Sequence, residues 1–203
     1  MTVAAPLLYP PQRPAQPSVV PAQWLDVSNH QGNLPPGFFE VWGARGYGGL
    51  VVQGVQGHDG QSYTRQQLHA AQTAGWRIAG YVWLNARQDL GRIETRLRYF
   101  GHFALDFLAL DVEEMGTTRG DIDLGLAVCD EYQGAPAWVY TAKWVFDGLG
   151  LSDNKYWADR NLWTAKYDGI PDVDAGFEPY GGWARCMMKQ YTDVPLDQNV
   201  RRV

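Results

Sequence analysis

The sequence predicts an α/β protein whose strands close into a barrel, and three observations lead to that expectation. Short apolar runs alternate with segments of helical spacing, at roughly 25–30 residues per unit over the first five strands, as in a parallel sheet with crossover helices. Polar or aromatic residues recur where these runs end, and a barrel gathers such ends on one face. The chain has 203 residues, which suit one well-buried core and are few for two.

Composition narrows the class of protein. With 45% hydrophobic and 19% charged residues, the chain has the composition of an ordinary globular protein. Its 9 Trp and 11 Tyr exceed what a core of this size needs, and exposed rings suit flat ligands such as sugars or nucleobases. A formal net charge of −5 argues against nucleic acid as the partner, because a phosphate backbone calls for a basic surface.

The cysteines and the N-terminus bear on the compartment. Cys129, expected on a helix, and Cys186, expected on a strand, lie far apart in apolar surroundings. We expect two free buried thiols, with a single disulfide as the alternative. No apolar run reaches the roughly 18 residues of a membrane span, so no membrane partner is expected. The N-terminus has no basic segment before its apolar residues, so we expect a protein made in the cytoplasm without a signal peptide.

Residues 1–22 differ from the rest of the chain. They hold six of the 12 prolines, which favour extended polyproline-type backbone and oppose a helix. We expect residues 1–22 to be a proline-rich arm or linker and residues 23–203 to form the barrel. The arm is either a floppy tail or an ordered strap that docks on its own domain or on a partner protein.

The elements of the barrel follow from local signals. A short strand begins at Gln23 and carries Asp26 near its end, before a polar turn. A helix expected at 64–74 ends at Gly75, a usual stop signal. The other expected helices are at 36–46, 89–103, 120–132 and 142–149, and the other expected strands, besides the acidic one, are at 50–53, 77–84, 136–140, 161–166 and 184–191.

The fourth strand is the apolar run that starts at Phe107 and ends in Asp111, Glu113 and Glu114. Four apolar residues in a row without a helical period fit a buried parallel strand. Strand side chains alternate, so Asp111 and Glu113 face the same way, roughly 6–7 Å apart, and Glu114 faces away. Neighbouring carboxyl groups push their pKa values apart, leaving one acid and one ionised partner. The alternative is a solvated loop acid or a cap of the next helix.

Other kinds of site have no matching motif. The glycine-rich stretch at 54–60 has neither the Gly-x-Gly-x-x-Gly spacing nor the Gly-Lys-Ser/Thr ending of a nucleotide site. The four histidines are scattered without the paired spacing of zinc ligands, and no Gly-x-Ser-x-Gly nucleophile motif occurs. We therefore expect no metal and no cofactor.

An acid or an aromatic ring recurs at the strand ends that a barrel would bring together. Together they describe an acidic pocket walled by rings, which hydrolysis of a glycosidic bond requires: a proton for the leaving oxygen, negative charge beside an oxocarbenium-like centre, and flat surfaces for sugars. For any single ring, ordinary packing is the alternative. The residues are Asp26, Tyr81, Trp83, Asp111, Glu113, Tyr140, Trp163, Tyr167, Tyr191 and Asp197.

Short motifs run from about Trp24 to Asn199. They are Asp26-Val-Ser-Asn-His-Gln-Gly32, Ala74-Gly75, Gly80-Tyr-Val-Trp83, Leu110-Asp-Val-Glu113, Val139-Tyr-Thr141, Leu162-Trp-Thr-Ala165 with Tyr167, Lys189-Gln-Tyr-Thr192 and Asp197-Gln-Asn199. In this order they resemble glycoside hydrolase family 25, the muramidases that include many phage endolysins and the Chalaropsis-type lysozymes. The resemblance implies a modified TIM-like barrel of five βα units and three further strands, (β/α)5(β)3.

The resemblance also implies roles for single residues. Glu113 matches the general acid/base, and Asp111 matches a partner carboxylate that either attacks the sugar or orients the substrate's 2-acetamido group as internal nucleophile. Asp26 and Asp197 match outer acids of the cleft, whose charge would help to keep Glu113 protonated. The rings implied to bind glycan are Tyr81, Trp83, Tyr140, Trp163 and Tyr191.

The chain departs from the family pattern in two places, which bear on whether activity is retained. Gln53 and Gln56 stand where the family often has a Lys and a Glu. The short connection from Asp193 to Leu196 replaces a longer hairpin, so that Asp197 is the best match for the last cleft acid and Asp193 is a rival.

The resemblance therefore predicts a cofactor-free muramidase, or lysozyme, that cleaves the β-1,4 bond between N-acetylmuramic acid and N-acetylglucosamine in bacterial peptidoglycan. Such an enzyme would act on the cell wall as a bacteriolytic endolysin or be associated with a virion. One alternative is a glycan-binding or structural barrel with weak or no activity. Another is a glycoside hydrolase that cleaves chitin-like polymers with the same acids.

Overall fold

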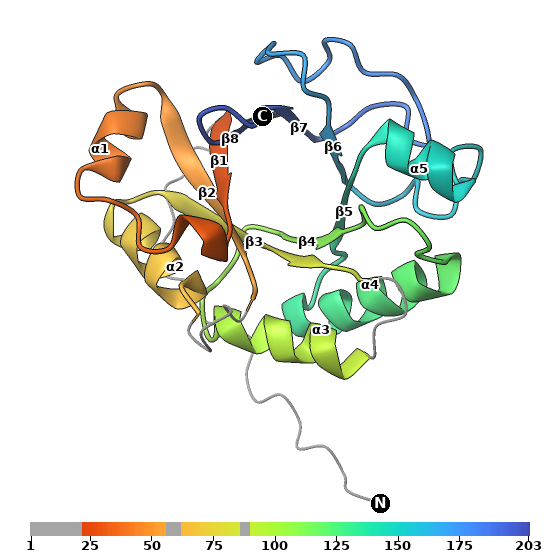
Figure 1. Ribbon diagram of the computed structural model, residues 1–203, viewed down its shortest axis with the longest axis horizontal. Coiled ribbons are helices and arrows are strands. Elements are labelled where there is room, and N and C mark those ends of the chain that lie inside the picture. The colour runs from red at the N-terminus through yellow and green to blue at the C-terminus, as the bar shows by residue number, and fades with distance from the viewer. Residues whose placement is uncertain (1–21, 56–61, 86–89) are drawn as a thin grey trace, which may run out of the picture.

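The computed structural model describes residues 22–55, 62–85 and 90–203, and it confirms the predicted barrel (Figure 1). Strands β1 to β7 pair in parallel in chain order, and β8 closes the ring antiparallel to both β7 and β1. The strands are β1 (Gln23–Val27), β2 (Tyr47–Gln53), β3 (Arg77–Trp83), β4 (Leu108–Asp111), β5 (Trp138–Thr141), β6 (Leu162–Ala165), β7 (Met188–Thr192) and β8 (Asp197–Arg201).

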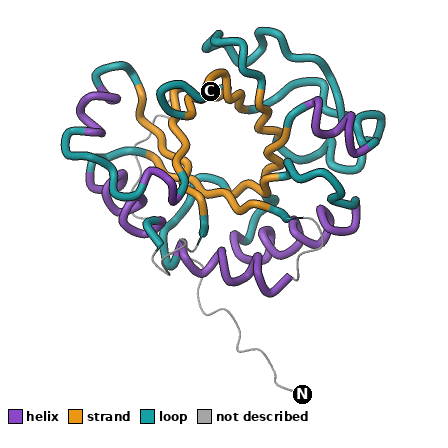
Figure 2. Tube along the Cα trace, in the orientation of Figure 1, coloured by secondary structure: helices purple, strands orange, loops and turns teal. Residues whose placement is uncertain are grey.

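Helices cover the outside of the ring along β1 to β5 (Figures 1 and 2). The connections from β6 to β7 and from β7 to β8 are loops without a helix. This arrangement agrees with the implied five βα units and three further strands. The helices are α1 (Phe38–Gly43), α2 (Thr64–Thr73), α3 (Leu90–Leu97), α4 (Arg119–Gln133) and α5 (Lys143–Leu149), with 3-10 turns η1 (Asn29–Gln31) and η2 (Arg98–Phe100).

Local sequence signals set the ends of the helices. Thr118 begins α4 with a capping box: its hydroxyl accepts from the Asp121 backbone N–H at 3.2 Å, and the Asp121 carboxylate accepts from the Thr118 N–H at 2.8 Å. Gly134 stops α4 with φ +69°. Gly75 follows α2 with φ +76°, where the sequence predicts the end of that helix. A glycine adopts this left-handed conformation without the penalty that a Cβ imposes.

The strands separate two apolar cores. The outer core lies between the strands and the helices, and the inner core fills the barrel with rings such as Trp24, Phe107 and Trp138. The ring of Phe107 stacks on that of Trp138 with centroids 4.1 Å apart, and the Arg201 guanidinium lies 5.1 Å from the Trp138 centroid. Gly49 makes room for Trp24, because a Cβ at Gly49 would lie 2.1 Å from the indole ring.

Several expected boundaries are corrected. The helix expected at 89–103 is α3 followed by η2, which ends at Phe100, and the strand expected from residue 184 begins at Met188. Cys186 therefore lies in a loop rather than on a strand, although the prediction of two free buried thiols is confirmed. The residues of β8 were not recognised as a strand, because Asp197-Gln-Asn-Val-Arg201 contains no apolar run.

Almost all of the arm expected at 1–22 lies outside the described residues. Ala22, the first described residue, accepts a hydrogen bond through its carbonyl oxygen from the Arg201 N–H at 2.7 Å. None of the described helices is long and apolar enough to cross a membrane.

Candidate active site

A pocket of about 180 Å³ opens at one end of the barrel, where the parallel strands have their carboxyl ends. It contains the four predicted acids and four of the five rings that the resemblance implies bind glycan. Its lining residues are Asp26, Tyr81, Trp83, Asp111, Glu113, Tyr140, Trp163, Tyr167, Gln190 and Asp197. In a barrel of this type, the site is expected at this end.

Strand register brings the four acids together. Asp26 lies near the end of β1 and pairs across the ladder with Asp197, the first residue of β8. Asp111 is the last residue of β4, and Glu113 follows it by two positions, so both side chains face the pocket as the alternation predicts. Because β8 is antiparallel, its first residue lies at the end where β1 and β4 finish.

Amide side chains from the last two strands hold Asp26 in place. The Asn199 Nδ2 donates to Asp26 Oδ2 at 2.7 Å, and the Gln190 Nε2 donates to the same oxygen at 3.4 Å. The indole of Trp163 donates in turn to Asn199 Oδ1 at 2.8 Å. The orientation of Asp26 is thus fixed by residues more than 160 positions later in the chain.

Tyr167, one of the rings expected at the strand ends, lines the pocket together with Gln190, which was not among the predicted site residues. The Oε1 of Gln190 accepts from the hydroxyls of Tyr140 and Tyr167, the latter at 3.2 Å. Tyr167 follows Trp163 by four positions and Ala165 by two, so the period of a strand places it on the inner face, as expected.

The acids form two hydrogen-bonded carboxyl pairs, of which Asp26 and Asp197 are the first. Burial, the charge of Asp197 and the bond between them raise the pKa of Asp26 well above its usual value. Burial and the charge of Asp193 raise the pKa of Asp197 to about 6, although hydrogen bonds from Gln190 and Asp26 lower it. The hydrogen bond within this pair thus raises the pKa of Asp26 and lowers that of Asp197.

Asp111 and Glu113 form the second pair. Burial is the largest cause that raises the pKa of each, and the charge of Glu113 raises that of Asp111 further, while the Arg96 cation lowers it. The bond between them raises the pKa of Asp111 and lowers that of Glu113. Asp111 Oδ1 is buried and has no hydrogen-bond partner among the described residues.

The aromatic rings differ in how much surface they offer. Trp163 is 1% exposed and forms the floor of the pocket, between the inner core and the acids. Trp83 is 37% exposed and Tyr167 is 54% exposed, so these two rings can present a face to a flat ligand.

One predicted ring lies elsewhere. Tyr191 does not line the pocket: it is the extra residue of a bulge between β7 and β8, and its hydroxyl lies 2.7 Å from that of Tyr47. Of the two rival acids, the pocket contains Asp197 and not Asp193. Glu114 faces away from the pocket, as expected, but it is half-buried and accepts from Asn85 Nδ2 at 2.9 Å rather than being fully solvated.

The neighbourhood of the pocket includes one of the two departures from the family pattern. Gln53 lines a second cavity, which shares Tyr81 and Trp83 with the acidic pocket. Gln56 lies outside the described residues. Among the residues that the structure describes, no group of three or more His, Cys, Asp or Glu side chains is arranged to hold a metal ion.

Buried carboxyl groups with raised pKa values and aromatic walls, at the carboxyl ends of barrel strands, are features of a glycoside hydrolase. Comparison with known proteins agrees. A sequence model of the family described as glycosyl hydrolases family 25 matches residues 25–200. The chain therefore belongs to glycosyl hydrolases family 25, and it is a glycoside hydrolase of the lysozyme type. A search of curated proteins finds no match.

Solved structures share the fold. A muramidase from Acremonium alcalophilum has 22% sequence identity and a TM-score of 0.67, over 89% of this chain and 93% of that chain. A family GH25 lysozyme from Aspergillus fumigatus has 17% identity and a TM-score of 0.68, over 91% and 95%. A spore cortex lytic enzyme from Clostridium perfringens has 17% identity and a TM-score of 0.70, over 90% and 67%.

Proposed function

We propose that the protein is an N-acetylmuramidase that cleaves the β-1,4 bond between N-acetylmuramic acid and N-acetylglucosamine in bacterial peptidoglycan. Family membership supplies the reaction class. The observation that carries the proposal is the position of Asp111 and Glu113, which line one pocket walled by rings at the end of β4, where burial raises the pKa of both carboxyl groups. Similar folds described as a muramidase and as a spore cortex lytic enzyme support peptidoglycan as the substrate.

Asp111 orients the acetamido group of the sugar. Its buried Oδ1 lacks a partner among the described residues, and an acetamido N–H is a donor that would supply one. Accepting that bond favours ionised Asp111, whose proton then passes along the existing hydrogen bond to Glu113. Substrate binding thus places the proton on the group that must donate it.

Glu113 acts as acid and then as base. It protonates the leaving glycosidic oxygen while the acetamido oxygen attacks C1, and it next removes a proton from the water that opens the cyclic intermediate. Burial and the charge of Asp197 raise the pKa of Glu113 and so help to retain its proton near neutral pH. Asp26 and Asp197 add negative charge beside the developing oxocarbenium centre.

The finer biological setting stays a prediction from the sequence. These predictions are a role as an endolysin or a virion component and a protein partner for the arm, almost all of which lies outside the described residues. The proposed reaction does not require them.

The test is digestion of purified peptidoglycan, with the released fragments reduced and weighed by mass spectrometry. We expect the wild type to release muropeptides with a reducible N-acetylmuramic acid end. Glu113→Gln should lower the rate about 10³-fold, because a positioned acid/base contributes on the order of 10²–10⁴-fold. The matched control is Glu114→Gln, which changes the adjacent carboxylate outside the pocket and should stay within about twofold of wild type.

Other outcomes would contradict the proposal in different ways. Reduced N-acetylglucosamine ends would assign cleavage of the other glycosidic bond. No release by folded wild type that still binds glycan would make the barrel a binding or structural protein. Full activity of Glu113→Gln would refute the assigned acid.

A further inference from the structure

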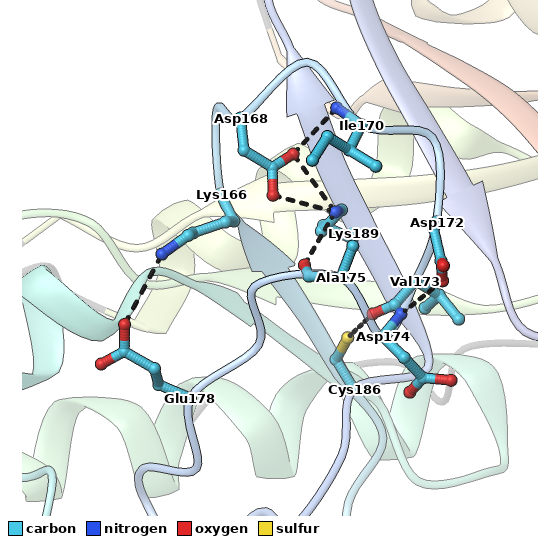
Figure 3. A network of polar contacts seen from close by, with 10 residues as sticks. All are labelled: Lys166, Asp168, Ile170, Asp172, Val173, Asp174, Ala175, Glu178, Cys186 and Lys189. Carbon is cyan, nitrogen blue, oxygen red and sulfur yellow. Dashed lines mark hydrogen bonds and ion pairs between the residues drawn. The ribbon is translucent and has the colours of Figure 1, made fainter.

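Lys189 on β7 is a buried cation outside the pocket (Figure 3). Its side chain has no exposed surface, and burying an ammonium group is costly unless hydrogen bonds replace its water. The Nζ has three N–H donors and three acceptors: both Asp168 carboxylate oxygens at 3.2 Å and the Ala175 carbonyl oxygen at 3.0 Å. All three acceptors belong to the segment that follows β6.

This segment, residues 166–187, connects β6 to β7 without a helix or a strand. Segments of this length without regular structure are uncommon in compact domains and are usually functional. Asp168 Oδ1 also accepts from the Ile170 N–H at 2.9 Å. Ala175 lies seven residues after Asp168. Lys189 therefore ties two separate parts of the segment to one point on β7.

Two contacts lie on opposite sides of the barrel wall at this point. Inside, the Tyr167 hydroxyl donates to Gln190 Oε1 at 3.2 Å, and its ring lines the acidic pocket. Outside, the next residue of the segment, Asp168, accepts from Lys189, the residue before Gln190. Neighbouring strand residues face opposite ways, so one position on β7 holds Tyr167 and Asp168 at once.

An apolar side chain could fill the space of Lys189. A buried ion pair adds little net stability compared with such a replacement, but its directed bonds define one arrangement of the groups that it joins. The bonds of Lys189 fix the backbone beside Tyr167 in one arrangement. The Tyr167 ring is the most exposed aromatic side chain of the pocket lining.

We propose that Lys189 is a positioning residue for glycan binding, which holds the Tyr167 ring as one wall of the substrate cleft through Asp168 and the Ala175 carbonyl. The ring takes a sugar unit of the substrate on its exposed face. This inference rests on the proposed function and adds to it a residue that contacts no substrate.

The first test compares Lys189→Met with Lys166→Met. Lys166 precedes Tyr167, but its side chain is 44% exposed and meets the exposed Glu178 at 3.6 Å, so its loss removes the same charge without freeing the segment. On soluble peptidoglycan fragments, Lys189→Met should raise KM about tenfold and leave kcat within about twofold, because stacking acts on substrate and transition state alike. Lys166→Met should match wild type within about twofold. Wild-type KM in folded Lys189→Met would overturn the inference.

A double-mutant cycle separates positioning from general destabilisation. If Lys189 acts through Tyr167, then Lys189→Met should change KM less than about twofold in a Tyr167→Ala background. An undiminished effect there would overturn the inference. Chymotrypsin should also cut faster after Tyr167 or Phe177 in Lys189→Met, since the released segment opens more often.

Two further measurements keep the test decisive. Asp168→Asn, which leaves Lys189 and an acceptor oxygen in place, replaces Lys189→Met if the latter does not fold, and it should raise KM in the same direction. Binding of an N-acetylglucosamine oligosaccharide, followed by tryptophan fluorescence, needs no turnover. Absence of muropeptides from wild type would overturn the proposed function, whereas unchanged oligosaccharide affinity in folded Lys189→Met would overturn the inference.

Discussion

The two ends of the barrel interior are built from the same strands, but one end is a packed aromatic core and the other an acidic pocket. On β1, Trp24 fills the first end and Asp26 lines the second, and on β5, Trp138 and Tyr140 divide in the same way. Residues two positions apart on a strand face the same side. The inward-facing residues of one strand therefore change from core rings at one end of the barrel to pocket residues at the other.

The packed end supplies stability, and it meets the open end at the ring of Trp163. The centroid of the Trp163 ring lies 6.3 Å from that of Phe107 in the packed end and 4.5 Å from that of Tyr140 in the open end. Trp163 also forms the floor of the pocket. Rings below the acids exclude water from one side, which makes ionising each carboxyl group costly and raises its pKa. Separate changes at the two ends should therefore affect stability and catalysis differently.

The largest expected effect is at the packed end. Phe107→Ala removes a ring that is 1% exposed and stacked on Trp138, and it should lower the free energy of unfolding by about 3–5 kcal/mol. The fraction that remains folded should keep kcat within about threefold, since no pocket residue is changed. Urea unfolding and turnover measure the two quantities.

Phe107→Leu is the control, because it keeps most of the apolar volume and should cost clearly less stability than the alanine variant. An unchanged urea midpoint of unfolding in Phe107→Ala would contradict the assignment of stability to the packed end.

At the open end, Asp111→Asn should lower kcat about 10²-fold and raise stability at pH 7. The activity falls because the acetamido group loses its ionised acceptor. The stability rises because the folded state holds the pKa of Asp111 above its unfolded value, so stability present at low pH is lost as pH rises through the folded value. Turnover and thermal unfolding at pH 7 test both, and a less stable Asp111→Asn would contradict the argument.

The smallest effect is the pH dependence from Asp197. Folding raises its pKa to about 6, so its contribution to stability is fully present below about pH 4 and is lost as pH rises through about 6. The loss should be about 1–2 kcal/mol, allowing for the partial exposure of Asp197. Urea unfolding of wild type and Asp197→Asn at pH 4 and pH 7 should give a smaller difference between the two pH values for the variant; equal differences would rule out this contribution.

The sequence predicted the pocket best where the signal lies within one strand. The apolar run into Asp111 and Glu113 identifies both the strand and the shared face of the two carboxyl groups. Asp26 and the rings of β3 and β5 follow from the same rule of alternation.

The residues that were missed depend on contacts across the barrel. Asn199 lies in a strand without an apolar run, and only the register of β8 brings it to Asp26. Tyr191 looked equivalent to the rings of other strands, but a bulge of one residue at the β7–β8 pair places its hydroxyl beside Tyr47. Such a bulge depends on the partner strand, so one strand's sequence does not reveal it.

Closure of the barrel by β8 also determines when, during synthesis, the active site is completed. β1, which is synthesised first, has β2 on one side and waits for β8, the last strand, on the other. Asp26 gains its amide partner Asn199 only then, across 173 residues of chain. On a ribosome, the seven earlier strands are an open sheet without Asp197 in place, so the capacity to cut glycan appears only after β8 has emerged.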